Sequence, residues 1–187
     1  MTASGFQVGP VSKLYPRAAD GIILTEWVSA LGYTFGDEIV PDHLWRILAA
    51  DRGPEGTPAP AWYHRACHYW LEYSGDDDIS YQKLKGGKHS SMVVQYLMKV
   101  RAVIWNRKLF TMEGWDVKKL YGLAPKETVE YDVVCILDEC SVPVVMRKKR
   151  EHWVLIGKCF VYGIMDGEAV EAILEGKRRK AQEVLVK

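Results

Sequence analysis

The chain has 187 residues, with 25 Lys and Arg against 24 Asp and Glu, so its net charge is +1. Hydrophobic residues make up 48%, which excludes a disordered chain and allows one domain with a buried core. The balanced charge does not favour nucleic acid or an anionic membrane as a partner. The sequence has no N-terminal apolar leader segment and no run of about 18 apolar residues, so we expect a cytoplasmic protein without a membrane span.

The first hundred residues are predicted to be mainly helical after an irregular start. Residues 1–19 contain Gly5, Gly9, Pro10 and Pro16, and we interpret them as an ordered arm or loop. A short β-like run at 22–24 leads into segments whose apolar residues recur at helical spacing between Gly, Pro or polar breaks. Helices are expected at 27–31, 41–51, 61–73 and 89–100.

The second half of the chain changes to β-rich segments near Trp105. Strands are predicted at 108–112, 131–137, 142–147 and 153–162, with hairpin turns at 138–141 and 148–151. A final helix is expected at 168–186. Helices followed by strands in blocks favour an α+β fold over a βαβ fold. We therefore predict one α+β domain over 1–187: a helical part (1–100) packed on a small antiparallel sheet or barrel (101–165) and closed by a C-terminal helix (166–187).

Three segments have a distinctive order of residues. Residues 43–52 read HLWRILAADR and precede a Gly/Pro-rich loop, and residues 107–125 read RKLFTMEGWDVKKLYGLAP. The most specific segment is 131–168, which ends in the stretch GKCFVYGIMDGE. Together, over about residues 21–170, they resemble the region downstream of the HET domain in fungal heterokaryon-incompatibility proteins.

The resemblance implies a stand-alone copy of that C-terminal module, because the HET domain, thought to be the signalling part in this family, is missing. The incompatibility function is therefore not carried over. The chain also departs from the family pattern: Tyr131 stands where the family has Gly, and Trp115-Asp116 interrupts the usual Gly-rich spacing.

No cofactor and no metal site are predicted. The cysteines at 67, 135, 140 and 159 form no Cys-x-x-Cys pair, and we interpret them as reduced, mostly buried thiols. His64 and His68 lie four residues apart on one helix face, but the sequence offers no third ligand nearby. The acidic run 76–78 lacks the alternation of a calcium loop, and 85–88 is more typical of a flexible turn than of a phosphate cradle.

Asp166 and Glu168 are the carboxylates best placed for chemistry, at the Gly-rich turn that follows the last predicted strand. A structural role is favoured, with Asp166 as a helix N-cap and Glu168 in the first helical turn. General acid catalysis remains the alternative. The basic runs 147–150 and 177–180 are interpreted as a solvated hairpin tip and a solvated helix face.

Aromatic residues are the other strong signal, with 7 Trp and 10 Tyr. Ordinary core packing is the default explanation, but an aromatic pocket between helices and sheet would also suit an apolar ligand. Our first hypothesis is a cofactor-free enzyme of fungal secondary metabolism, an intramolecular cyclase of the Diels–Alder type acting on a terpenoid or polyketide. Such a reaction needs a shaped cavity and a hydrogen-bond donor rather than a metal or nucleophile. The proposed walls are Trp105, Trp115, Trp153 and Tyr162, and the proposed catalytic donors are Arg107, Thr111, Tyr121 and His152.

The alternative hypothesis is a non-enzymatic binding or regulatory module related to heterokaryon-incompatibility proteins. Its interface would be formed by residues 147–150 and 168–187. A hydrolase or oxidoreductase comes third, because their usual signatures are missing. The partners expected for the first hypothesis are an apolar small-molecule substrate and no nucleic acid; a homodimer is left open.

Overall fold

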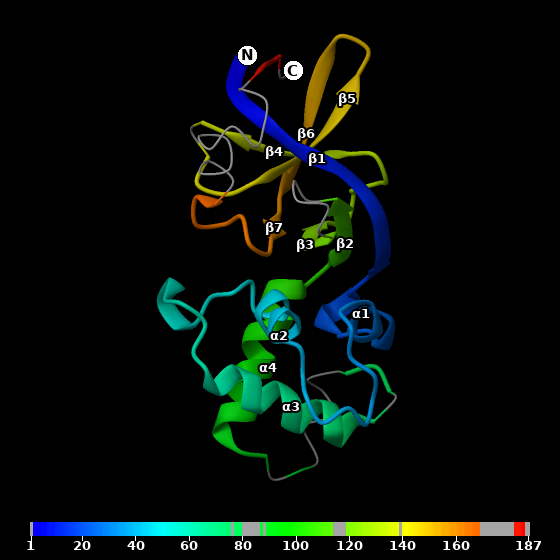
Figure 1. Ribbon diagram of the computed structural model, residues 1–187, viewed down its shortest axis with the longest axis vertical. Helices are drawn as coiled ribbons and strands as arrows, with labels where there is room; N and C mark the ends of the chain where they lie inside the picture. The colour runs from blue at the N-terminus through cyan, green and yellow to red at the C-terminus, as the bar shows by residue number, and fades with distance from the viewer. Residues whose placement is uncertain are drawn as a thin grey trace. The chain divides into compact units, whose positions relative to one another are not determined.

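The computed structural model describes residues 2–75, 77–79, 87, 89–113, 119–138, 140–168 and 182–185. The chain divides into two compact units (Figure 1): a helical unit, Tyr15–Arg107, and a sheet unit that combines Met1–Leu14 with Lys108–Lys187. The expectation of a single domain over 1–187 stays a prediction. Among the described residues, no helix has the length and apolar character needed to cross a bilayer.

The helical unit confirms the four helices predicted from apolar spacing. Its α-helices are α1 (Thr25–Ala30), α2 (Asp42–Leu48), α3 (Trp62–Ser74) and α4 (Ser91–Ile104), with short 3-10 turns η1 (Ala19–Gly21) and η2 (Pro54–Gly56). Helix α4 starts at Ser90, whose hydroxyl accepts a hydrogen bond from the Val93 amide; this is the usual N-cap arrangement. The buried residues of α4 recur at helical spacing and form one face: Val93, Tyr96, Leu97, Val100 and Ile104.

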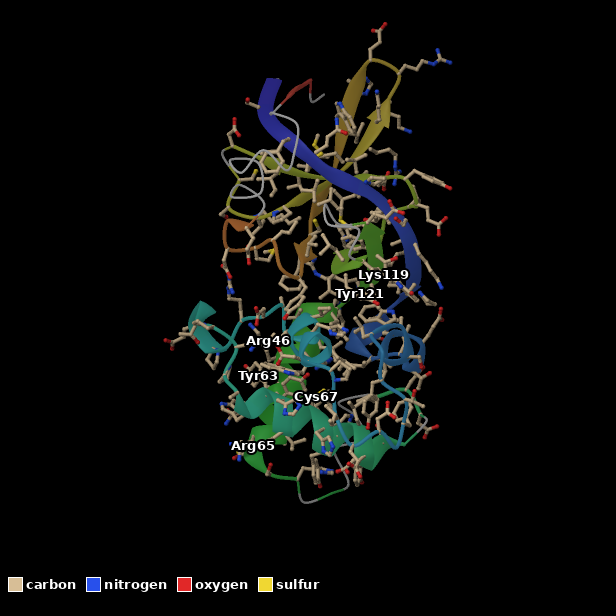
Figure 2. All side chains as sticks on the ribbon, in the orientation of Figure 1. Arg46, Tyr63, Arg65, Cys67, Lys119 and Tyr121 are labelled. Carbon is tan, nitrogen blue, oxygen red and sulfur yellow. The ribbon has the colours of Figure 1, made fainter. Side chains whose placement is uncertain are left out.

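Large aromatic side chains fill the core of the helical unit. Trp27, Trp45 and Trp70 are all at most 2% exposed. On α3, Tyr63 and Cys67 are buried, and both are labelled in Figure 2. Most of the tryptophans of this unit therefore serve packing, the default explanation given above.

The sheet unit is an open antiparallel sheet with the strand order β6-β5-β4-β1-β2-β3-β7. Because β6 and β7 are the two ends of this order, the chain does not adopt the closed barrel left open above. Strand β8 pairs with β1 off this path. The strand bounds are Thr2–Arg17 (β1), Arg107–Glu113 (β2), Lys119–Pro125 (β3), Val133–Leu137 (β4), Val144–Lys149 (β5), His152–Lys158 (β6), Phe160–Val161 (β7) and Gln182–Leu185 (β8).

Alternating residues place two apolar clusters on opposite faces of β4 and β5. Val134 and Val145 join a cluster that gathers buried side chains from β1, β2, β3 and β7. Cys135 and Val144, their neighbours in sequence, join a second and smaller cluster. Both faces of these strands are thus covered.

The expectation that residues 1–19 form an arm or loop is wrong, because Thr2–Arg17 is the long strand β1. The glycines and prolines are accommodated within the strand. A bulge separates Gln7 from Gly9, and Pro10 lies opposite Val133 in the ladder with β4. At Gly5 a Cβ atom would collide with the carbonyl oxygen of Ile136, so this glycine permits the close pairing of β1 with β4.

The end of the chain also differs from the prediction. Residues 169–181, most of the predicted C-terminal helix, lie outside the described residues. Gln182–Leu185 is strand β8 and pairs with Thr2–Gly5, so the predicted helix does not extend to residue 187. Strand β3 was not predicted as a strand. The α+β class is confirmed, but the sheet draws strands from both halves of the sequence.

Candidate functional site

A wide hollow lies at the C-terminal end of α4 in the helical unit. Its volume is about 690 Å³. Of the described residues that line it, three lie on α4 and one is the residue that follows α4, at spacings i, i+3, i+4 and i+7, and another is the first residue of β2. The lining residues are Met98, Arg101, Ala102, Trp105 and Arg107.

The turn that follows α4 fixes the position of Trp105. Trp105 ends the helix, and Asn106 adopts a left-handed conformation with φ of 55°. The Asn106 amide donates to Ala18 O at 3.0 Å, and the Ala18 amide donates to Arg107 O at 2.9 Å. These two hydrogen bonds hold the turn, and the Trp105 side chain remains 43% exposed.

Arg101 is positioned between Trp105 and the backbone of η1. Its guanidinium carbon lies 4.9 Å from the centre of the Trp105 ring system, which is a cation–π distance. On the other side, a Cβ atom at Gly21 would lie 2.5 Å from Arg101 Cγ. Gly21, with φ of 71°, therefore leaves room for the stem of this arginine.

Among the described residues, the lining of the hollow contains two arginines, Arg101 and Arg107. Met98, 54% exposed, adds an apolar surface beside them. Guanidinium groups donate hydrogen bonds in a planar fork that matches carboxylate and carbonyl oxygens. The arrangement can hold a flat apolar skeleton that carries such an oxygen.

The hollow combines two of the eight residues predicted for the site, Trp105 and Arg107. Trp115 lies outside the described residues. The remaining five belong to the sheet unit. The predicted pocket between helices and sheet therefore stays a prediction.

Two predicted site residues of the sheet unit are neighbours. The Tyr162 amide donates to Tyr121 O at 2.9 Å, where β7 meets β3. Lys119 Nζ lies 5.1 Å from the centre of the Tyr121 ring; both residues are labelled on the sheet unit in Figure 2. Both tyrosines are partly buried, so each presents only part of its ring.

Two other predicted residues of the sheet unit, Thr111 and Trp153, have surroundings that indicate structural roles. Thr111 is only 3% exposed within β2. Trp153, on β6 next to His152, packs against the smaller apolar cluster of β4 and β5. Lys148 Nζ lies 5.9 Å from the Trp153 ring. Trp153 therefore covers one face of the sheet.

Two charged residues of the most specific sequence segment, Asp132 and Arg147, pair with each other. Arg147 Nε donates to Asp132 Oδ1 at 2.7 Å, and Arg147 Nη2 donates to Asp132 Oδ2 at 2.8 Å. The Asp132 side chain also accepts from the Val129 amide at 2.9 Å, and Arg147 donates to Glu127 O at 2.9 Å. This ion pair raises the pKa of Arg147. These contacts fasten the turn before β4 to β5.

The two histidines of α3, His64 and His68, each contact a backbone carbonyl oxygen. The Nε2 atom of His64 lies 3.3 Å from Val40 O, and that of His68 lies 3.1 Å from Glu38 O. Each ring thus anchors the segment that precedes α2. No group of three or more potential metal ligands occurs within the part of the chain that the structure describes.

At the predicted carboxylate turn, Glu168 Oε2 accepts a hydrogen bond from the Asp166 amide at 2.8 Å. Both residues are exposed. The carboxylate that receives a backbone amide here is thus Glu168, although Asp166 was the predicted cap. This contact favours the structural role over general acid catalysis.

Sequence reasoning missed an imidazole enclosed by aromatic rings. His89 makes edge-to-face contacts with Tyr69, Trp70 and Tyr73, at centroid distances of 6.2, 5.5 and 4.9 Å. Both ring nitrogens of His89 and Trp70 Nε1 are buried without a hydrogen-bond partner among the described residues. The two tyrosines follow each other at i, i+4 on α3, which the sequence does show, but nothing in it indicates that His89 packs there.

Comparison of the chain with protein-family models, with curated proteins and with solved structures found no match. The resemblance to the C-terminal region of heterokaryon-incompatibility proteins stays a prediction.

Proposed function

We propose that the protein binds an apolar small molecule in the hollow at the end of α4 and catalyses its intramolecular cyclisation without a cofactor. The observation that supports the proposal is the combination, in one concave site, of the exposed Trp105 ring with the Arg107 side chain. Of the four donors predicted from sequence, only Arg107 lines this hollow.

The reaction class is a cycloaddition of the Diels–Alder type. Two carbon–carbon σ bonds form from the π electrons of a diene and an alkene in the same molecule, and no atom, proton or electron is gained or lost. The protein would hold the chain folded, with the reacting carbons close to one another. Arg107 would donate a hydrogen bond to the carbonyl oxygen conjugated with the alkene, and that bond strengthens as negative charge develops on the oxygen. Trp105 would form the wall against which the diene lies.

The test uses a linear trienone, in which a conjugated enone is tethered to a diene. We expect the protein to increase the rate of cyclisation and to change the ratio of ring-fusion isomers relative to buffer. Arg107→Gln and Trp105→Ala should reduce both effects, whereas Arg65→Gln, which changes an exposed arginine of α3, should not. An unchanged rate and isomer ratio with the wild-type protein would refute the catalytic proposal.

The exposure of the hollow favours one alternative, a binding module without catalysis. Trp105 and Met98 are 43% and 54% exposed, and a site so open to water gives a developing oxyanion little protection from solvent. A ligand that binds the hollow and returns chemically unchanged would support this alternative.

A further inference from the structure

We propose that the turn end of the β5–β6 hairpin enters the major groove of duplex DNA, with its cations against the phosphates on both sides of the groove. The inference goes beyond the proposed function and does not depend on it, because the hairpin belongs to the sheet unit and the hollow to the helical unit. The expectation of no nucleic-acid partner was based on the charge of the whole chain, which averages over this hairpin.

The first argument is charge. The turn end of the hairpin carries three successive cations, Lys148, Lys149 and Arg150, and all three are exposed. None of them forms an ion pair with another described residue. Lys148 Nζ lies 5.9 Å from the Trp153 ring, and a lysine in such a contact keeps N–H donors for an anion. Because no carboxylate in the described part of the chain pairs with these cations, they attract a polyanion.

The second argument is the reach of the hairpin. Strand β5 pairs with β4 only over residues 144–146, whereas its pairing with β6 continues to Lys149 and His152. Figure 1 shows this end of the hairpin as a two-stranded ribbon that projects beyond the other strands of the sheet unit. The four residues from Met146 to Arg150 extend about 13 Å at about 3.3 Å per residue. The major groove of B-form DNA is about 8.5 Å deep, so the ribbon is long enough to reach its floor.

The third argument is the distribution of the cations. Successive residues of a strand point to opposite faces, and residues paired across two strands share a face. Lys148, opposite Trp153, therefore lies on one face of the ribbon, and Lys149, opposite His152, lies on the other. A flat membrane would meet the cations of one face only, whereas both walls of a groove carry phosphates. The major groove of B-form DNA is about 12 Å wide and admits a two-stranded ribbon, but that of duplex RNA is too narrow.

The experiment measures the fluorescence anisotropy of a labelled DNA duplex of about 20 base pairs during titration with the 187-residue chain. Three phosphate contacts predict a slope of about −2.7 for the logarithm of the binding constant against the logarithm of the salt concentration. The affinity should therefore fall about fortyfold between about 50 mM and about 200 mM salt. Duplex RNA of the same sequence and vesicles that contain phosphatidylserine are titrated at the same salt concentrations, and both should bind more weakly.

The variants assign the binding to the turn end of the hairpin. Lys149→Gln and Arg150→Gln should each weaken DNA binding and change the slope to about −1.8. Glu151→Gln, which removes the acid of the turn, should strengthen DNA binding. Lys119→Gln changes an exposed lysine of β3 and should leave affinity and slope unchanged. An unchanged midpoint of urea unfolding shows that each variant is folded.

Three results would each overturn the inference: no binding of the DNA duplex at about 50 mM salt, unchanged affinity and slope in both cation variants, or binding of RNA or vesicles as tight as that of DNA. The last result would mean that the cations attract any phosphate surface and that the ribbon does not enter a groove. The outcome is separable from that of the proposed function, because the trienone assay reports the hollow at the end of α4 and the DNA titration reports the hairpin.

Discussion

The ion pair of Asp132 and Arg147 provides the most direct test of the structure, through the substitution Asp132→Asn. Asp132 is 2% exposed and the Arg147 side chain is 29% exposed. Removing one partner of a buried pair costs about 3–5 kcal/mol, because the other charge is left without compensation. Since water can reach Arg147 in part, we expect a loss of about 3 kcal/mol, the lower end of this range.

The assay is native-state hydrogen exchange of the β4 and β5 amides, which reports the stability of the sheet unit itself. Asp42→Asn in the helical unit is the matched control, and its cost is read from the exchange of the α4 amides. It removes an aspartate that also pairs with an arginine, at 2.8 Å from Arg46, but is 65% exposed, so its cost should stay below about 1 kcal/mol. The double variant Asp132→Asn/Arg147→Met should recover part of the loss, since it removes the uncompensated charge. Equal costs for the Asp132 and Asp42 substitutions would refute the assignment of Asp132 as a buried, paired carboxylate.

Three further predictions concern buried and exposed polar groups. Burial raises the pKa of Cys67 and of Cys135 to about 12 from 9.0, so each thiol adds stability that is complete below pH 9.0 and is lost as the pH rises toward 12. The wild-type protein should therefore lose unfolding free energy between pH 8 and pH 10, and Cys67→Ala should make this loss smaller by about 1.4 kcal/mol. An unchanged pH dependence in the variant would contradict this. Of the four cysteines only Cys140 is exposed, so one thiol should react quickly with an aromatic disulfide reagent in the folded protein. Rapid reaction of a second thiol, or of any thiol in the Cys140→Ser variant, would argue against the burial of the other three cysteines. His89→Phe should keep the aromatic packing and remove two ring nitrogens that lack hydrogen bonds to the described residues. We expect the free energy of unfolding, measured by urea titration, to rise by about 1 kcal/mol. A clear loss of stability would mean that the imidazole has a hydrogen-bond partner.

Helix positions were predictable because they depend on local spacing. The face that α4 buries repeats at i, i+3, i+4 and i+7, and this pattern is visible in residues 93–104 without any knowledge of the partner surface. The hairpin of β5 and β6 was predictable for the same reason, since its turn at 150–151 lies between two β-rich runs.

Strand β1 could not be predicted, because its partner is distant in sequence. Gly5, Gly9 and Pro10 locally favour a loop. Pairing with β4 compensates for this local preference, and the bulge between Gln7 and Gly9 accommodates the shift in the register of the two strands. Gln182–Leu185 became a strand through pairing with the other side of the same segment, where the sequence had suggested helix. In both cases tertiary contacts outweighed local propensity.

The candidate site was only partly predictable. Trp105 and Arg107 were named from the sequence, and the helical spacing of Met98, Arg101 and Trp105 was present in it. Their grouping was missed because it depends on where α4 ends and on the tight approach of Gly21 to Arg101. The aromatic pocket expected from tryptophan content stays a prediction, and most tryptophans of the helical unit are core residues.

The pairing of Phe6 with Ile136 has a consequence for synthesis on the ribosome. The helical unit, Tyr15–Arg107, lies wholly between these partners in the chain and can fold as soon as it emerges. Strand β1 must wait for β4, for a time on the order of ten seconds at about 5–20 residues per second. During this interval the edge of β1 that pairs with β4 has no partner strand on the nascent chain, and the high contact order of this ladder slows closure further. The sheet unit therefore completes its folding later than the helical unit, which can fold before β4 is made.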